Sequence, residues 1–199
     1  MTDTTIQTQL LASSRKLFLK FGYSKVTMDE VAREMGMSKK TVYLYYPSKL
    51  KLMEEVISEM KNEIIMGVRK IMENPHAATI EKLKQSMIFT GEKLSVISPF
   101  VAADLARNVP NLWDLLKKIR YELAYKNIHA LVEEGIKSGS LRKEISPELL
   151  LMFYSCAVQY LRDTSFVNDF PKEIQQKIPA TADKVFEGIV EMLFRGIAG

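Results

Sequence analysis

The sequence has few of the residues on which metalloenzymes and disulfide-rich proteins depend. Its 199 residues include one cysteine, Cys156, and two histidines, His76 and His129, which are far apart. A single cysteine cannot form an internal disulfide, so a disulfide scaffold is excluded and a reducing cytoplasm is expected. The sequence also contains no metal-ligand cluster, phosphate-binding glycine loop or nucleophile elbow. We therefore expect no metal, no cofactor and no enzymatic activity.

Long apolar runs are missing as well. The longest, residues 149–158, is interrupted by Ser155 and bounded by Glu148 and Arg162. A membrane-spanning helix needs about 20 apolar residues, which this run does not reach. The N-terminal segment is polar and contains Asp3, whereas a secretory signal needs a basic start and a continuous apolar stretch. We expect a soluble, cytoplasmic protein that neither enters a membrane nor is exported.

Positive charge is present in excess, and it lies at one end of the chain. The whole sequence has 28 Lys and Arg residues against 24 Asp and Glu residues, a net charge of +4. Residues 1–50 carry this entire excess, and residues 51–199 are neutral in sum. A basic module joined to a neutral one is typical of proteins that bind a polyanion, because neutralising phosphates releases condensed counterions. A merely solvated basic face is the alternative.

Apolar residues recur at helical spacing through most of the chain, and no strand pattern competes with them. Helices are expected at residues 4–21, 28–35, 38–46, 49–72, 79–96, 99–107, 112–138, 147–166 and 181–197. The sequence thus predicts an all-α fold, and its 47% hydrophobic content is enough for a substantial core. We place the boundary between two domains near Pro47: residues 1–47 form an N-terminal three-helix domain, and residues 48–199 form a C-terminal helical domain.

Two short helices in the N-terminal domain are separated by Gly36. Thr27 and Glu30 have the spacing of a capping box that starts the first of these helices. Gly36 supplies the left-handed backbone conformation that ends it, and Ser38 caps the second helix. Two short helices supported by a preceding one predict a helix-turn-helix, in which the second helix lies in the DNA major groove.

Side chains suited to DNA contact gather on this second helix and beside it. Lysines can pair with phosphates, threonines can touch base edges, and tyrosines combine a ring with a hydroxyl donor. The candidate DNA-binding residues are Thr27, Lys39, Lys40, Thr41, Tyr43, Tyr45 and Lys49. Thr27 caps a helix whether or not it touches DNA, and both tyrosines have packing as their alternative role. Two more inward aromatics beside Val42 and Tyr46 would overfill a small core, which favours DNA contact.

This region resembles the TetR (tetracycline repressor) family of bacterial regulators. Residues 18–52 read FLKFGYSKVTMDEVAREMGMSKKTVYLYYPSKLKL. They contain the family patterns Phe-x-x-x-Gly-Tyr, Thr-x-x-x-Val-Ala-x-x-x-Gly and Ser-x-x-x-x-Tyr-x-Tyr-x-x-Ser-Lys. The family usually has Phe at the position of Tyr46 and often Gly at that of Lys40, which leaves the operator sequence open. The resemblance implies operator binding by the seven residues named above.

The same resemblance implies a homodimeric transcriptional regulator that senses a small molecule. We expect a repressor that a small, largely apolar or aromatic ligand releases from a near-palindromic operator, with activation as the alternative. Release requires the ligand to favour the DNA-incompetent arrangement of the two reading helices. The long helix at 49–72 is the expected lever. The rival function is a helical adaptor that binds another protein and whose helix-turn-helix does not bind DNA. Salt-dependent binding to random duplex DNA distinguishes the two functions.

The last two long helices are the expected dimer interface. The final helix has two apolar stripes, Val185-Ile189-Met192 and Phe186-Val190-Leu193-Ile197. One stripe can serve the domain core, and the other needs a partner, such as a four-helix interface with a second copy. The candidate interface residues are Leu150, Ala157, Leu161, Phe186, Val190, Leu193 and Ile197.

Large aromatic side chains are concentrated in the middle helices, and ligand cavities have mostly apolar walls with a few polar groups. The candidate pocket residues are Phe89, Phe100, Trp113, Tyr121, Tyr125, Phe153 and Tyr154, with Asp104, Arg107, His129 and Gln159 as possible polar partners. Ordinary core packing is the alternative for each of these rings.

Overall fold

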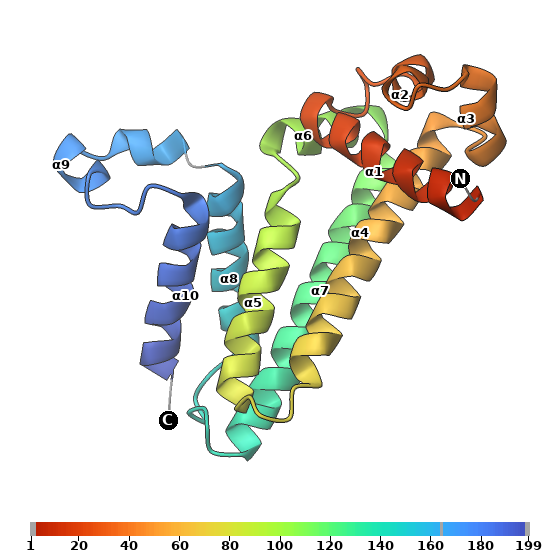
Figure 1. Cartoon of the computed structure of the whole chain (residues 1–199). Helices are drawn as coiled ribbons and strands as arrows, with labels where there is room; N and C mark the ends of the chain where they lie inside the picture. Colours follow the sequence, from red (N-terminus) through yellow and green to blue (C-terminus); the bar gives the residue numbers. More distant parts are fainter. Residues whose placement is uncertain (1–2, 164, 198–199) are drawn as a thin grey trace. The chain divides into compact units, whose positions relative to one another are not determined.

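The structure, a computed structural model, describes residues 3–163 and 165–197, and only the backbone of residues 3, 4, 160–162, 166 and 197. Over these ranges the regular elements are helical and no strand occurs, which confirms the all-α prediction (Figure 1). The helices are α1 (Asp3–Phe21), α2 (Met28–Glu34), α3 (Lys39–Tyr45), α4 (Lys49–Met72), α5 (Thr79–Ser95), α6 (Pro99–Asn108), α7 (Pro110–Lys137), α8 (Pro147–Arg162), α9 (Lys172–Gln175) and α10 (Ala182–Ile197), with a 3₁₀ turn η1 (Ser165–Asp169).

The chain divides into two compact units. Unit 1 consists of Met1–Glu63 and Ile97–Lys118, and unit 2 consists of Ile64–Val96 and Ile119–Gly199. This division differs from the boundary expected near Pro47, since most of α4 and all of α6 belong with the N-terminal helices. The reason is that α4 continues without a break and supplies buried residues such as Leu52 and Val56 to unit 1.

Unit 1 contains the helix-turn-helix. The predicted capping box starts α2: the backbone N–H of Glu30 donates to Thr27 Oγ1 at 3.2 Å, and the N–H of Thr27 donates to the Glu30 carboxylate at 2.7 Å. Gly36 has the left-handed φ of 63°. Ser38 Oγ accepts from the backbone N–H of Thr41 at 3.1 Å, which caps α3. These local bonds fix the turn between α2 and α3.

Unit 2 has its own core, in which α5, α8 and α10 pack against one another. Leu83, Met87 and Phe186 are almost completely buried. The close approach of α10 to α5 depends on Gly91, because a Cβ atom at this position would lie 2.6 Å from Cζ of Phe186. The ring of Phe186 therefore takes the place of a side chain on α5.

Candidate nucleic-acid interface

One side of α3 is packed and the other faces outward. Val42 and Tyr46 are buried at 0% and 3% exposure, and they anchor the helix to unit 1. Lys39 and Lys40 are exposed, as is Tyr43. Thr41 and Tyr45 are half-buried at the edges of the packed side. The outward side thus carries two ammonium groups and a phenol, which suit phosphates and base edges.

Sequence reasoning missed Leu44, which is 77% exposed on the same outward side of α3. The spacing of Leu44 from the buried residues of α3 does predict its exposure. Leu44 stands two residues from both Val42 and Tyr46, and two residues turn a helix by about 200°. An exposed leucine beside basic residues can contact the methyl group of thymine.

Lys39 and Lys40 differ in their surroundings. Nζ of Lys39 donates to the carboxylate of Asp29 on α2 at 2.8 Å, and this hydrogen bond, together with the negative charge, raises the pKa of Lys39. Lys40 forms no ion pair with any residue that the structure describes. Lys40 is therefore the ammonium group on α3 most available to a phosphate.

Lys49, predicted to bind a phosphate at the start of α4, points into unit 1. Its Nζ donates to the carbonyl oxygens of Tyr23 and Val26, both at 2.9 Å, and lies 4.3 Å from the centre of the Tyr23 ring. Burial lowers the pKa of this ammonium group. Two of its three N–H donors are occupied by these carbonyl oxygens, so in this arrangement Lys49 ties the α1–α2 connection to α4. Sequence could not reveal the two carbonyls because they belong to a turn that is distant along the chain.

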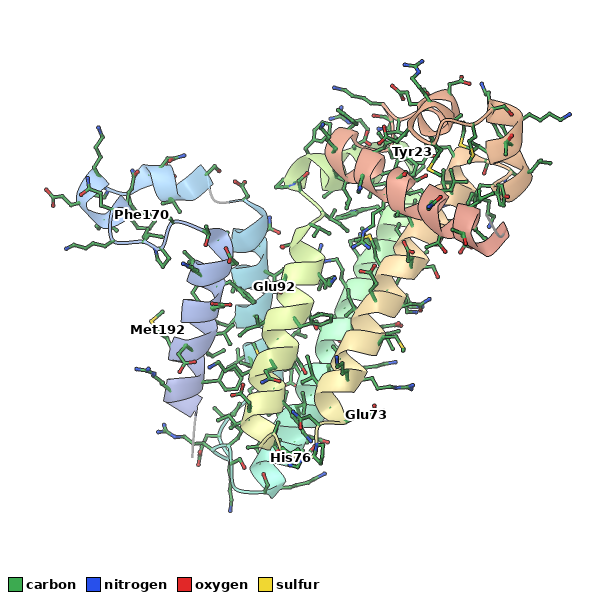
Figure 2. The ribbon with its side chains drawn as sticks, viewed as in Figure 1. Tyr23, Glu73, His76, Glu92, Phe170 and Met192 are labelled. Carbon is green, nitrogen blue, oxygen red and sulfur yellow. The ribbon has the colours of Figure 1, made fainter. Side chains whose placement is uncertain are left out.

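Asp104, predicted as a polar pocket residue, instead contacts the turn after α1. Its carboxylate accepts from the backbone N–H of Ser24 at 2.9 Å and from the amide of Asn108 at 2.8 Å. Burial raises the pKa of Asp104, but these hydrogen bonds outweigh it, and the net shift is downward. Gly22 makes the contact possible: it has φ of 83°, and a Cβ there would lie 2.8 Å from the carboxylate. Unit 1 is thereby closed by α6, which packs on α1. Figure 2 labels Tyr23, which lies in this turn.

The seven candidate pocket residues are divided between the two units. Phe100 and Trp113 lie in unit 1, and the other five lie in unit 2. Tyr121 is exposed and stacks on Tyr125 at a ring distance of 5.3 Å. Phe89 packs against Gly67, and Phe153 is exposed on α8.

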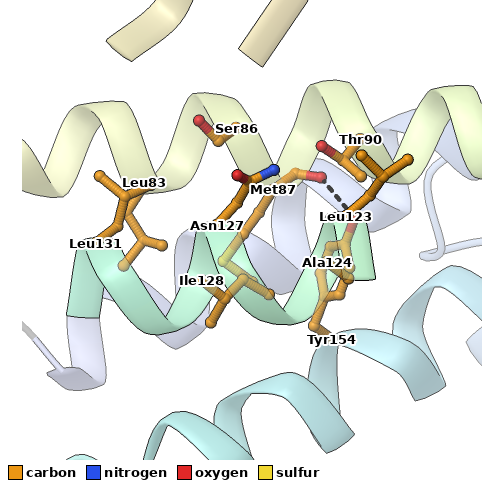
Figure 3. Close-up of a pocket in the computed structure, with 10 residues that line it drawn as sticks. All are labelled: Leu83, Ser86, Met87, Thr90, Leu123, Ala124, Asn127, Ile128, Leu131 and Tyr154. Carbon is orange, nitrogen blue, oxygen red and sulfur yellow. Dashed lines mark hydrogen bonds between the residues drawn. The ribbon is translucent and has the colours of Figure 1, made fainter. Parts of the chain in front are cut away.

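Unit 2 contains a small cavity of about 10 Å³ between α5, α7 and α8 (Figure 3), and of these seven residues Tyr154 alone lines it. The other proposed polar partners are also dispersed. Arg107 and Gln159 are exposed. His129 lies beside Tyr125 and Glu133 on α7.

The predicted interface residues also need correction. Leu150, Ala157, Phe186 and Val190 are buried within unit 2, so they serve its core rather than a partner. Leu193 is half-buried, and the side chains of Leu161 and Ile197 lie outside the described residues.

The open apolar stripe is instead formed by Leu149, Met152 and Phe153 on α8 and by Met192 on α10, all more than half exposed. A groove of about 870 Å³ lies between α8, α10 and the segment 167–179 that connects them, and Phe153 and Met192 are among the residues that line it. Figure 2 shows Met192 projecting outward from α10. The final helix thus has the two stripes expected from the sequence: Phe186 and Val190 of one stripe are buried, and Met192 of the other is exposed.

No helix in the described part of the chain combines the length and apolar character needed to cross a membrane.

Comparison with known proteins assigns the chain to a family. The sequence model for bacterial regulatory proteins of the tetR family matches residues 10–56, which include α2 and α3. The chain is 30% identical over 190 residues to the uncharacterized HTH-type transcriptional regulator YvaF of Bacillus subtilis (strain 168), covering 95% of this chain and 94% of YvaF. The protein therefore belongs to the TetR family of DNA-binding transcriptional regulators.

Two solved structures share the fold at low sequence identity. The ketosteroid transcriptional regulator KstR2 of Mycobacterium tuberculosis superposes with a TM-score of 0.66 at 19% identity, covering 100% of this chain and 97% of that one. The fatty acid degradation regulator FadR of Bacillus halodurans superposes with a TM-score of 0.69 at 17% identity, covering 98% of each chain. The likeness extends over both units and confirms the pairing of a helix-turn-helix with a larger helical part.

Proposed function

We propose that this protein is a homodimeric repressor that inserts α3 into the major groove of a near-palindromic operator. The observation that carries the proposal is the outward side of α3, where Lys40, Tyr43 and Leu44 stand exposed over the buried pair Val42 and Tyr46. Thr27, Lys39, Thr41 and Tyr45 complete the proposed contact surface. Lys49 contributes by holding the turn between α1 and α2, because its ammonium group is occupied by two carbonyls.

A second copy of the chain is the proposed occupant of the open stripe on α8 and α10. The stripe is apolar and highly exposed in a single chain, which favours a partner with a matching apolar face. In a twofold-symmetric dimer the stripe of one copy contacts the same stripe of the other copy, which supplies such a face. Dimerisation would present two copies of α3 to half-sites about 34 Å apart, one turn of DNA.

A small, largely apolar ligand in unit 2 is the proposed signal that relieves repression. The related folds of KstR2 and FadR belong to regulators named for ketosteroids and fatty acid degradation, both chemistries of large apolar molecules. Helix α4 begins four residues after α3 and continues into unit 2, so it is the proposed lever between ligand and reading helix. Activation by the ligand is the alternative outcome of the same linkage.

Selection from a random duplex library tests the operator proposal without knowledge of the regulated genes. The full-length protein is expected to enrich sequences with two inverted half-sites. Fluorescence anisotropy on an enriched sequence should then show that Lys40→Ala and Tyr43→Ala each weaken binding about tenfold, which corresponds to the loss of one good contact. Lys143→Ala, which removes an exposed lysine from unit 2, is the matched control and should bind normally. Enrichment of a single unrepeated half-site would reject the dimeric arrangement, and unchanged affinity of both variants would reject α3 as the reading helix.

A further inference from the structure

The turn between α1 and α2, residues 22–26, is held by side chains from two other helices of unit 1. Nζ of Lys49 on α4 donates to two carbonyl oxygens of the turn, both at 2.9 Å. The carboxylate of Asp104 on α6 accepts from the backbone N–H of Ser24 at 2.9 Å. Surface turns are usually among the more mobile parts of a protein. Here three backbone groups of one turn are bound by side chains that are distant along the chain.

Helix α6 fits this turn closely, and it packs beside α1 (Figure 1). A Cβ atom on Gly22 would lie 2.8 Å from the carboxylate of Asp104 and 3.2 Å from Cε1 of Phe100. The second oxygen of Asp104 accepts from the side-chain amide of Asn108, one turn further along α6, at 2.8 Å. Both carboxylate oxygens are therefore engaged, and the orientation of the group is fixed from both sides.

The negative charge of Asp104 is unexpected in a unit that binds DNA, because a carboxylate repels phosphates. Part of this charge acts on Lys49: it raises the pKa of the ammonium group, although burial lowers that pKa by more. The two side chains that hold the turn thus have opposite charges. The electrostatic cost of Asp104 for DNA binding calls for a compensating role, and its bond to Ser24 indicates one.

The position of the turn is passed on to the helix-turn-helix. The turn ends at Val26, and the next residue, Thr27, is the N-cap of α2. Helix α2 packs against α3, and Asp29 on α2 holds Nζ of Lys39 on α3 at 2.8 Å. A shift of the turn therefore moves the start of α2, and through α2 it reaches α3.

We infer that Asp104 is a positioning residue for operator binding: it does not contact DNA, but its bond to Ser24 fixes the turn and thereby the placement of α2 and α3. Without this bond the turn would adopt several arrangements, and the affinity for DNA would fall with the fraction of protein in the competent one. Asp104 lies outside residues 10–56, which the family's sequence model matches. The inference rests on the proposed function, since it takes α3 as the reading helix.

Fluorescence anisotropy of the full-length protein on an enriched operator tests the inference with two replacements of Asp104. Both Asp104→Ala and Asp104→Asn remove the negative charge, but only asparagine keeps an oxygen that can accept from Ser24. We expect Asp104→Ala to bind about fivefold more weakly, which corresponds to the net contribution of one hydrogen bond, and Asp104→Asn to bind with nearly the natural affinity. A purely electrostatic role predicts the opposite sign, tighter binding by both variants, because a charge that repels phosphate is gone.

Two further measurements separate positioning from other effects. The slope of log K against log salt concentration should be the same for Asp104→Ala and the natural protein, since no phosphate contact is lost. Hydrogen exchange should accelerate in residues 22–26 of this variant and stay unchanged in α8 and α10, whereas a general loss of stability would accelerate both. Asp114→Ala removes an exposed carboxylate from the same unit and is the matched control, with no loss of affinity expected.

Two outcomes would overturn the inference. One is natural or tighter operator binding by Asp104→Ala, and the other is equal weakening by Asp104→Ala and Asp104→Asn. If Asp104→Ala does not fold by circular dichroism, Asp104→Ser replaces it with the same expected loss, because its shorter side chain does not reach Ser24. Lys40→Ala and Tyr43→Ala are measured beside these variants. Weakening by these two but not by Asp104→Ala contradicts this inference alone, whereas natural affinity of Lys40→Ala and Tyr43→Ala contradicts the proposed function.

Discussion

Asp29 lies beside α3, the proposed reading helix, and would compete with DNA for Lys39. Its carboxylate holds Nζ of Lys39 at 2.8 Å, and both side chains are about half exposed. A phosphate that approaches Lys39 must displace this carboxylate and also meets its negative charge. If α3 reads DNA as proposed, we expect Asp29 to limit how strongly it binds any duplex, whatever its sequence.

Replacing Asp29 by asparagine is expected to raise the affinity for random duplex DNA. The freed Lys39 adds about one phosphate contact, so the slope of log K against log salt concentration should steepen by about 0.9. Anisotropy titrations at several salt concentrations measure both quantities. Asp114→Asn, which breaks the exposed Asp114–Lys117 pair on α7, is the control and should change neither. An unchanged slope for Asp29→Asn would show that Lys39 does not approach a phosphate.

At the scale of helices, sequence was informative about where elements start and stop. Thr27, Glu30, Gly36 and Ser38 signalled the short helices correctly because capping is local and each signal lies within three residues of its partner. Which side of each helix faces the core was harder to predict. Both stripes of α10 are apolar, and which stripe lies inside depends on tertiary contacts such as that of Phe186 with Gly91.

The candidate site could also be predicted only in part from the sequence. The outward side of α3 followed from helical spacing, apart from Leu44. The inward direction of Lys49 depends on carbonyls 23 and 26 residues earlier in the chain, and local sequence carries no signal for them. The dispersal of the aromatic residues between two units likewise depends on tertiary structure.

Gly91→Ala tests the packing of α5 against α10. The added methyl group would lie within 2.7 Å of two ring atoms of Phe186, whose side chain is fully buried and cannot move freely. Overpacking of this kind costs about 1–3 kcal/mol of unfolding free energy. Urea denaturation followed by circular dichroism measures it. Gly196→Ala, where a methyl group meets nothing within 4 Å, should be neutral or slightly stabilising. Equal stability of the two variants would mean that Phe186 does not occupy this position.

At the scale of the whole molecule, we expect the oligomeric state to depend on the open stripe of α8 and α10. Met192→Glu places a charge where Met192 is 68% exposed, so a single chain should fold normally. The same charge would be buried against a second copy, which is strongly unfavourable without a partner. We expect this variant to elute as a monomer in size-exclusion chromatography with light scattering, and to lose high-affinity operator binding.

Met66→Glu is the matched control for that experiment. Met66 lies on α4 and is 63% exposed, so the substitution has the same chemistry and nearly the same surroundings in a single chain. It should leave the dimer intact. Dissociation by both variants would indicate a general effect of added charge, and dimers from both would exclude the stripe as the interface.

The division of α4 between the two units has a practical consequence for chimeric regulators. A fragment that stops at Pro47 would leave behind Leu52 and Val56, which are fully buried in unit 1, and would also lack Asp104, which binds the turn after α1. Transplanting the DNA specificity of this protein onto another sensor therefore requires two separate grafts, residues 1–63 and residues 97–118. A simple head swap at the start of α4 would yield a hybrid with an incomplete hydrophobic interior.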